Sequence, residues 1–319
     1  MKKGKKRGKS KMKENIYNKK FSFGIDLEIK LEEYRKIINK YGKYINSVYF
    51  SLPFGDEFHS RLKMRDEYGK KGAINKLFDI LMLFKSEKIK LEAVINQYNI
   101  DTTSLKNALN ELKKFIKVDA ICCLNEYVDI ILKYYDENIY LVSSYNNGPI
   151  HRENIKDISS KYNMVVLGKE FMREPKLIRE VRERGFDIKL LVNGGCSFNC
   201  FNCRAGKNNC VKVFNSNLKK FSYNELYAMQ SFFPWELRKI INLTENENLI
   251  QEIKISSRPS NYEYIEKCLD FYINGKDVRE IVSEDFRNYY LFARQANLTP
   301  YFNQLQYEEI EKIKYELWE

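Results

Sequence analysis

The stretch "MVVLGKEFMREPKLIREVRERGFDIKLLVN", residues 164–193, decides the fold. It contains two solid apolar runs separated by a segment with helical periodicity. Pro175 lies in the first turn of that segment and Gly185 lies at its end. Proline is favoured at the start of a helix and glycine just beyond its end. The stretch therefore predicts one strand–helix–strand unit.

The same alternation recurs along most of the chain. Eight apolar runs are expected to be strands, and seven of them are soon followed by a helical segment. The runs are solidly apolar rather than alternating, which is typical of parallel strands buried on both faces. The expected strands are 21–27, 46–54, 91–96, 118–124, 138–144, 164–171, 187–193 and 250–257.

The segments between these runs predict helices from their 3.6-residue periodicity. The helix near 71–87 is expected to bury one face against the sheet. That face would carry Ile74, Leu77, Ile80, Leu81 and Phe84. The other expected helices are near 31–42, 103–115, 125–135, 152–162, 174–185, 223–231 and 261–273.

The count and order of these elements predict an α/β fold, namely a (β/α)8 TIM-like barrel over residues 21–275. A C-terminal helical extension, residues 276–319, would cap it. A doubly wound open sheet is the alternative. It is disfavoured because no GxGxxG follows a strand and no Walker P-loop occurs.

The active sites of such barrels lie at the carboxyl ends of the strands. Glu170 leaves the sixth expected strand, a group of cysteines leaves the seventh, and Arg258 leaves the eighth. Glu170 is a candidate general base or substrate ligand, and the alternative is a carboxylate paired with a neighbouring cation. Arg258 is a candidate ligand for a carboxylate or phosphate, and the alternative is a salt bridge at a helix start.

The net charge of +12 is concentrated at one end of the chain. Residues 1–20 carry +9 of it, so the remaining residues are only mildly basic. The tail has too few large apolar residues to offset the entropy of ordering, and we expect it to be disordered. It could be an arm that binds RNA through phosphate contacts, or only a solubilising leader.

Nothing in the sequence predicts a membrane protein. No run of eighteen apolar residues occurs, and no apolar core follows the basic N-terminus as it would in a signal peptide. The expected compartment is the reducing cytoplasm. Clustered cysteines there indicate a metal or redox site rather than disulfides.

Four of the seven cysteines lie within fifteen positions, in the loop at residues 194–210. Thiolates are soft ligands, and four of them at this spacing favour an iron–sulfur cluster or zinc. Gly194, Gly195 and Gly206 would let the backbone approach such a group closely. The predicted ligands are Cys196, Cys200, Cys203 and Cys210.

The spacing C-x3-C-x2-C of the first three cysteines is also that of radical-SAM enzymes. Those enzymes place the motif after the first strand of their barrel, whereas most of a barrel precedes it here. Only 116 residues follow Cys203. Cys210 is also superfluous for a cluster that leaves one iron open, so the radical-SAM interpretation is disfavoured.

Two segments of the chain resemble the collagenase-like peptidase family (peptidase family U-32). They are "MVVLGKEFMREPKLIREVRERGFDIKLLVNGGCSFNC" and "EIKISSRPSNYEYIEKCLDFY". The similarity extends over roughly residues 20–275. The family's Arg-Glu pair is Lys169-Glu170 here, and its Glu-Gly-Arg is Ser256-Ser257-Arg258. The chain thus resembles a divergent member, and its substrate does not carry over.

The resemblance implies a barrel and, in members with four such cysteines, a 4Fe–4S cluster. Several members act in oxygen-independent hydroxylation of ubiquinone precursors or RNA bases, and others are described as proteases. The first functional hypothesis is therefore an iron–sulfur enzyme that modifies RNA or a small aromatic metabolite, with Glu170 and Arg258 orienting the substrate.

Two other hypotheses remain open. One is a non-catalytic protein, stabilised by zinc or a cluster, that binds RNA or a partner chain. The other is a protease, which ranks lowest because no HExxH or GxSxG motif occurs and the chain has only two histidines.

Overall fold

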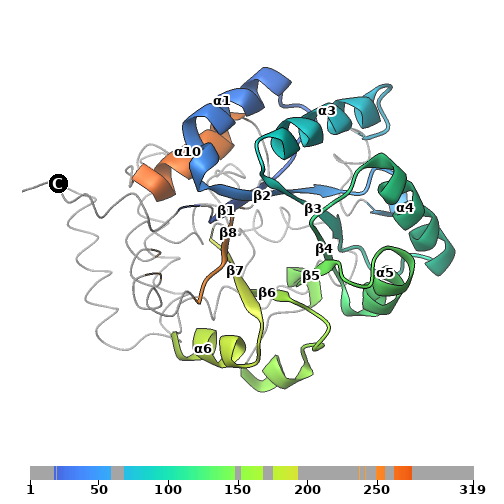
Figure 1. The fold of residues 1–319 in the computed structure, drawn as a ribbon, viewed down its shortest axis with the longest axis vertical. Coiled ribbons are helices and arrows are strands. Elements are labelled where there is room, and N and C mark those ends of the chain that lie inside the picture. Colours follow the sequence, from blue (N-terminus) through green and yellow to red (C-terminus); the bar gives the residue numbers. More distant parts are fainter. Residues whose placement is uncertain are drawn as a thin grey trace, which may run out of the picture.

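The computed structural model describes residues 20–58, 68–147, 152–167, 175–192, 249–255 and 262–274, together with the single residues 18, 237 and 241. Within these ranges eight parallel strands pair in chain order, and the last strand pairs with the first (Figure 1). The sheet is thus a closed barrel. The predicted TIM-like fold is confirmed, and the alternative of an open doubly wound sheet is wrong.

The strands form at the eight predicted apolar runs, and the first, second, fourth and fifth strands are shorter than their runs. Phe23 packs its ring against Phe84 of an outer helix, with 5.9 Å between the ring centroids. Since side chains alternate along a strand, Ser22 and Gly24 face the barrel interior. The strands are β1 (Phe21–Gly24), β2 (Ile45–Ser51), β3 (Lys90–Ile95), β4 (Ala120–Cys123), β5 (Tyr140–Ser143), β6 (Met164–Leu167), β7 (Asp187–Leu191) and β8 (Glu252–Ile255).

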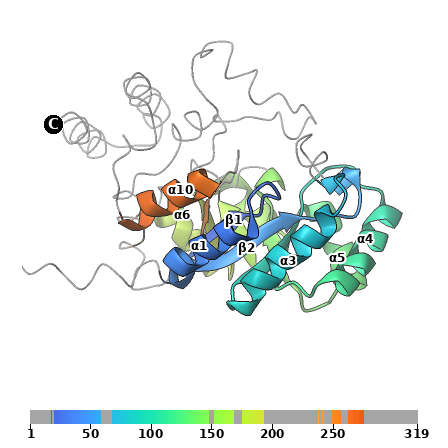
Figure 2. The same ribbon diagram turned by 90° about the horizontal axis from the view of Figure 1, so that it is seen from above.

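The helices form the outer layer of the barrel (Figure 1). Figure 2 shows the first two described α-helices side by side along the outside of β2. α6 begins at Pro175 and ends before Gly185, whose positive φ of 89° suits glycine, as predicted. The helices are α1 (Leu31–Tyr41), α3 (Ala73–Ser86), α4 (Thr102–Phe115), α5 (Val128–Tyr134), α6 (Pro175–Glu183) and α10 (Tyr262–Asn274).

The predicted buried face of α3 was wrong at one position. Leu77, Ile80, Leu81 and Phe84 are fully buried, as expected, but Ile74 is 41% exposed. Ala73 takes its place on the buried face. Residues 73, 77, 80 and 84 follow the helical period more closely, and Ile74 lies one step around the helix.

The predicted helix near 152–162 is replaced by a short 3-10 helix, η6 (Arg152–Asp157). The N–H of Ile158 donates to the carbonyl of Ile155, three residues back, at 3.3 Å. The hydroxyl of Ser159 then accepts from the N–H of Lys161 at 3.3 Å. Serine side chains that bond the local backbone compete with the α-helical pattern, which accounts for the early end.

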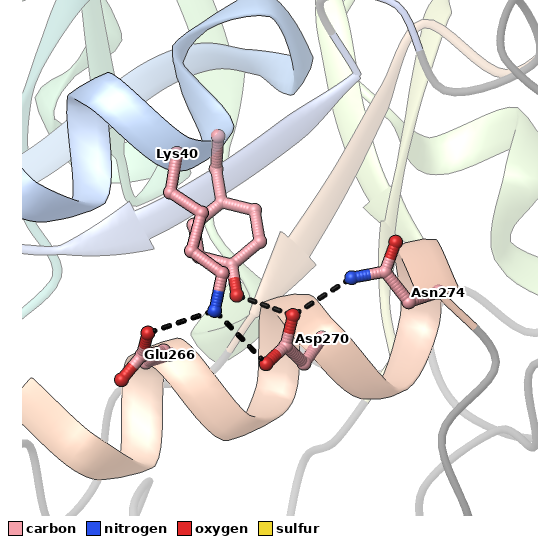
Figure 3. Close-up of polar contacts among 5 residues, drawn as sticks. Lys40, Glu266, Asp270 and Asn274 are labelled. Carbon is pink, nitrogen blue, oxygen red and sulfur yellow. Dashed lines mark hydrogen bonds and ion pairs between the residues drawn. The ribbon is translucent and has the colours of Figure 1, made fainter.

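A polar network joins the first helix to the last (Figure 3). Asp270 of α10 accepts hydrogen bonds from the Tyr41 hydroxyl and from Asn274 Nδ2, the latter at 2.7 Å. Lys40 of α1 lies 3.2 Å from Asp270 and 2.9 Å from Glu266. Burial opposes ionisation of Asp270, but these hydrogen bonds outweigh it and hold the pKa of its carboxyl below the usual value. The network therefore supports closure of the barrel between β8 and β1.

Replacing Tyr41 with Phe should lower the free energy of unfolding by about 1–2 kcal/mol, because it removes a hydrogen bond to a buried carboxylate. The matched control is Tyr44→Phe, at a half-buried tyrosine three residues away. Urea denaturation of both variants measures the difference. Equal stability of Tyr41→Phe and the wild type would mean that the α1–α10 network adds nothing.

Several predictions fall outside the described residues. They are the basic tail except for residues 18 and 20, the cysteine loop 194–210, the helix near 223–231, and the extension 276–319. Among the helices that are described, none is both long and apolar enough to cross a membrane.

Candidate active site

Three charged side chains from three strands meet inside the barrel. The ammonium of Lys189 on β7 lies 2.5 Å from Glu92 Oε2 on β3 and 2.6 Å from Glu252 Oε1 on β8. The three residues are 0%, 2% and 3% exposed. Because β3 and β7 lie on opposite sides of the closed sheet, the side chains reach each other across the interior. We refer to these three residues as the buried ion cluster.

The carboxylates of this cluster are bonded to different extents. Glu252 accepts hydrogen bonds from Asn46 Nδ2 at 2.6 Å and from the Ser47 hydroxyl at 3.0 Å. By contrast, Glu92 Oε1 is buried and has no hydrogen-bond partner within the described part of the chain. Buried polar atoms nearly always have a partner, so this oxygen marks a place for water or a ligand group.

Mutual attraction keeps Lys189 and Glu252 charged. Burial alone would lower the pKa of Lys189, but the two carboxylates raise it above the usual lysine value. Burial would likewise raise the pKa of Glu252, but the charge and hydrogen bond of Lys189 hold it below the usual value. Two carboxylates and one ammonium give the cluster a formal charge of −1.

Stability alone does not explain these charges. The interior of a TIM barrel is usually filled by branched aliphatic side chains. Replacing a buried ion pair by well-packed apolar residues is often neutral or stabilising. The buried ion cluster therefore favours a role in binding or chemistry.

A second polar layer lies nearer the carboxyl end of the strands. Lys254 follows Glu252 by two residues, so it faces the same interior roughly 7 Å further along β8. Its ammonium stands 4.1 Å from the centroid of the Tyr49 ring. The Tyr49 hydroxyl donates to the carbonyl of Ile255 at 2.9 Å, which fixes the ring.

Cys122 of β4 faces the same interior, because it lies two residues after Ala120, the register partner of Glu92. Burial raises the pKa of this thiol to about 11, and the nearby lysines only partly offset that effect. The thiol is therefore protonated and uncharged at neutral pH. Cys122, Cys123 and Cys268 are all buried. Within the described ranges, no group of three or more His, Cys, Asp or Glu residues could hold a metal.

The predicted site residues themselves lie outside the described residues. These are Glu170, Arg258, Cys196, Cys200, Cys203 and Cys210. The strands that lead to them are described, and β6, β7 and β8 are consecutive neighbours in the barrel. In sequence, Glu170 comes three residues after β6, Cys196 five residues after β7, and Arg258 three residues after β8.

Sequence analysis missed the charged interior. Four charged residues interrupt apolar runs that are otherwise typical of buried strands. They are Glu92, Lys189, Glu252 and Lys254. A charged residue inside such a run was the signal that could have revealed the charged interior. On a strand covered on both faces, a charged side chain cannot reach solvent.

Comparisons with known proteins show no family for this chain. No family model matches the chain, and no curated protein matches it by sequence. A mutant tryptophan synthase alpha-subunit from Pyrococcus furiosus aligns at 10% identity over 81% of this chain and 99% of that chain, with a TM-score of 0.46. A GH113 beta-1,4-mannanase aligns at 10% identity over 82% of this chain and 99% of that chain, with a TM-score of 0.43. At these scores the likenesses say nothing about what this chain binds.

Proposed function

We propose that this chain is an iron–sulfur enzyme, a divergent relative of the collagenase-like peptidase family, with its reaction at the carboxyl-terminal end of the barrel. The supporting observation is that β6, β7 and β8 are neighbours. Parallel neighbours end at the same side of a barrel. In sequence, Glu170 comes after β6, the four cysteines come after β7, and Arg258 comes after β8.

The donor set fits the proposed group. Four thiols within one glycine-bearing loop match the ligand chemistry of a 4Fe–4S cluster, and zinc is the alternative for the same donors. When bound, such a cluster supplies one-electron transfer. The proposed ligands are Cys196, Cys200, Cys203 and Cys210.

The protein's own residues would bind and position the substrate. Glu170 would accept or donate a proton, which is the usual role of a carboxylate at a strand end. Arg258 would hold an anionic group through its two parallel N–H donors. The proposed reaction is oxygen-independent hydroxylation, or a related modification, of RNA or a small aromatic metabolite. For an RNA substrate, the basic residues 1–20 would add salt-sensitive affinity.

The experiment compares strains grown without oxygen. A deletion strain should lose a modified nucleoside or accumulate a quinone intermediate, as detected by mass spectrometry. The wild-type gene should restore the profile. Glu170→Gln should restore it about 100-fold less effectively, because loss of a general acid–base group typically costs about 10²–10⁴ in rate. Arg258→Ala should also restore it poorly, because the substrate's anionic group loses its bidentate partner. Iron content of the purified variants should stay unchanged.

The matched controls are Glu180→Gln and Arg179→Ala on α6, the helix that follows Glu170 in the chain. Both should restore the wild-type profile. Unchanged nucleosides and quinones in the deletion strain would contradict the proposed reaction. If the purified protein cleaves other proteins, and still does so after the four cysteines are replaced, the protease hypothesis is favoured instead.

A further inference from the structure

Lys254 is a lysine in the barrel interior whose described partner is an aromatic ring. Its side chain is half-buried, and its ammonium stands 4.1 Å from the centroid of the Tyr49 ring. Among the described residues, no carboxylate lies within ion-pair distance of it. Attraction to an aromatic face holds an ammonium in place without neutralising it. The position therefore offers a fixed positive charge.

The carboxylates of the buried ion cluster form their ion pairs with a different lysine. Glu92 and Glu252 each contact Lys189 at 2.5–2.6 Å, one layer deeper in the barrel. The cluster has a formal charge of −1, and it lies beneath Lys254. Its carboxylates pair with Lys189 and do not occupy the hydrogen-bond donors of Lys254.

The group across the interior from Lys254 does not supply an anion either. Cys122 is the nearby titratable side chain on β4, and burial raises its thiol pKa to about 11. Among the described residues, therefore, neither this thiol nor a carboxylate pairs with the ammonium, which can bind an anion that enters from the carboxyl end. The interior of an eight-stranded barrel is only wide enough for side chains or one small ligand. Whatever reaches Lys254 must therefore be small.

We propose that Lys254 binds a small oxyanion group, a carboxylate or a phosphate, on a substrate that enters at the carboxyl-terminal end of the barrel. Tyr49 positions the ammonium. This inference names the substrate class of the proposed enzyme. It rests on the proposed function only for the location of the reaction, at the carboxyl-terminal end of the barrel.

The test is calorimetric titration of the full chain with inorganic phosphate and, separately, with succinate. We expect at least one anion to bind the wild type, and Lys254→Met to weaken that binding at least tenfold. Lys254→Arg, which keeps the charge, should stay within a few fold of the wild type. The stronger of the two anions identifies the source of the oxyanion group.

The matched control is Lys133→Met. Lys133 also stands over a tyrosine ring, 5.4 Å from the Tyr134 centroid, but it lies exposed on the outer helix α5. This variant should bind like the wild type, and the basic tail contributes equally to every variant. Equal affinity of the wild type and Lys254→Met, or no binding of either anion by the wild type, would overturn the inference.

Binding is measured without turnover, so it separates this inference from the proposed function. A protein that holds zinc and modifies nothing could still show the Lys254-dependent titration. If Lys254→Met fails to fold, anion-dependent thermal stabilisation of the wild type is compared with Lys254→Arg and Tyr49→Phe. In Tyr49→Phe, loss of the hydroxyl that fixes the ring should reduce the anion-dependent rise in melting temperature. The same rise in melting temperature in all three proteins would overturn the inference.

Discussion

Replacing Lys189 with Met should lower the free energy of unfolding by about 3–5 kcal/mol. Lys189 is fully buried and is the ion-pair partner of both Glu92 and Glu252. Without it, two carboxylates remain in the barrel interior, and among the described residues no other positive charge lies within ion-pair distance of them. Leaving a buried charge uncompensated costs far more than an ion pair contributes, so the effect should be among the largest of any single substitution here.

The control variants separate lost charge from lost packing. Lys90→Met, at an exposed lysine at the start of β3, should change stability by less than about 0.5 kcal/mol. Combining Lys189→Met with Glu92→Gln and Glu252→Gln should recover much of the loss, because the buried charges are then gone. A Lys189→Met protein within about 1 kcal/mol of the wild type by urea denaturation would show that the cluster is not buried as described.

The pH dependence of the two proteins should have opposite sign. In the wild type the pKa of Glu252 is lowered, so its stabilising effect is present above the ordinary carboxyl pKa and is lost as pH falls through the folded value. In Lys189→Met the isolated carboxylates are destabilised by burial, which raises their pKa. That variant should therefore gain stability as pH falls from 8 toward about 5.

Replacing Cys200 and Cys203 together with Ser should remove nearly all bound iron and sulfide. A 4Fe–4S cluster needs its thiolate ligands, and a serine hydroxyl is a poor substitute for a soft thiolate. We expect less than about a tenth of the wild-type iron after anaerobic purification, with loss of the visible absorption. The far-ultraviolet circular dichroism of the barrel should stay close to that of the wild type.

Cys268→Ala is the matched control, because Cys268 is a buried cysteine on α10. It should keep its iron and its colour. If Cys200 and Cys203 can be replaced without loss of metal, or if Cys268→Ala loses as much as they do, the assignment of ligands to the cysteine loop fails.

The barrel was predictable because its strands have a simple local signature. Runs such as "NIYLVSS" and "MVVLGKEF" are solidly apolar, and each strand lies within its run. The runs overestimate most strands because hydrophobicity continues past the last ladder hydrogen bond. Leu52, for example, is fully buried although β2 ends at Ser51.

The charged interior could not be assembled from sequence alone. Glu92 and Lys189 are separated by 97 positions, and their contact depends on the position of β3 and β7 across a closed barrel. Periodicity shows which residues share a strand face but carries no information about a partner so far along the chain. The two residues were visible as charges in apolar runs, while their pairing was not.

The proposed site residues depended instead on residue type and spacing. Four thiols within fifteen positions predict a metal-binding loop without any knowledge of the fold. The functional assignments of Glu170 and Arg258 rest on their positions after strands, together with the family resemblance. The described structure adds that β6, β7 and β8 are neighbours.

The most direct measurement is the iron, acid-labile sulfide and zinc content of the protein purified without oxygen. We predict a brown protein with about four iron and four sulfide ions per chain, because four thiolates are the usual ligands of a 4Fe–4S cluster. We also predict only traces of zinc. A colourless protein with stoichiometric zinc and no iron would contradict this prediction, and would favour a zinc-stabilised binding protein.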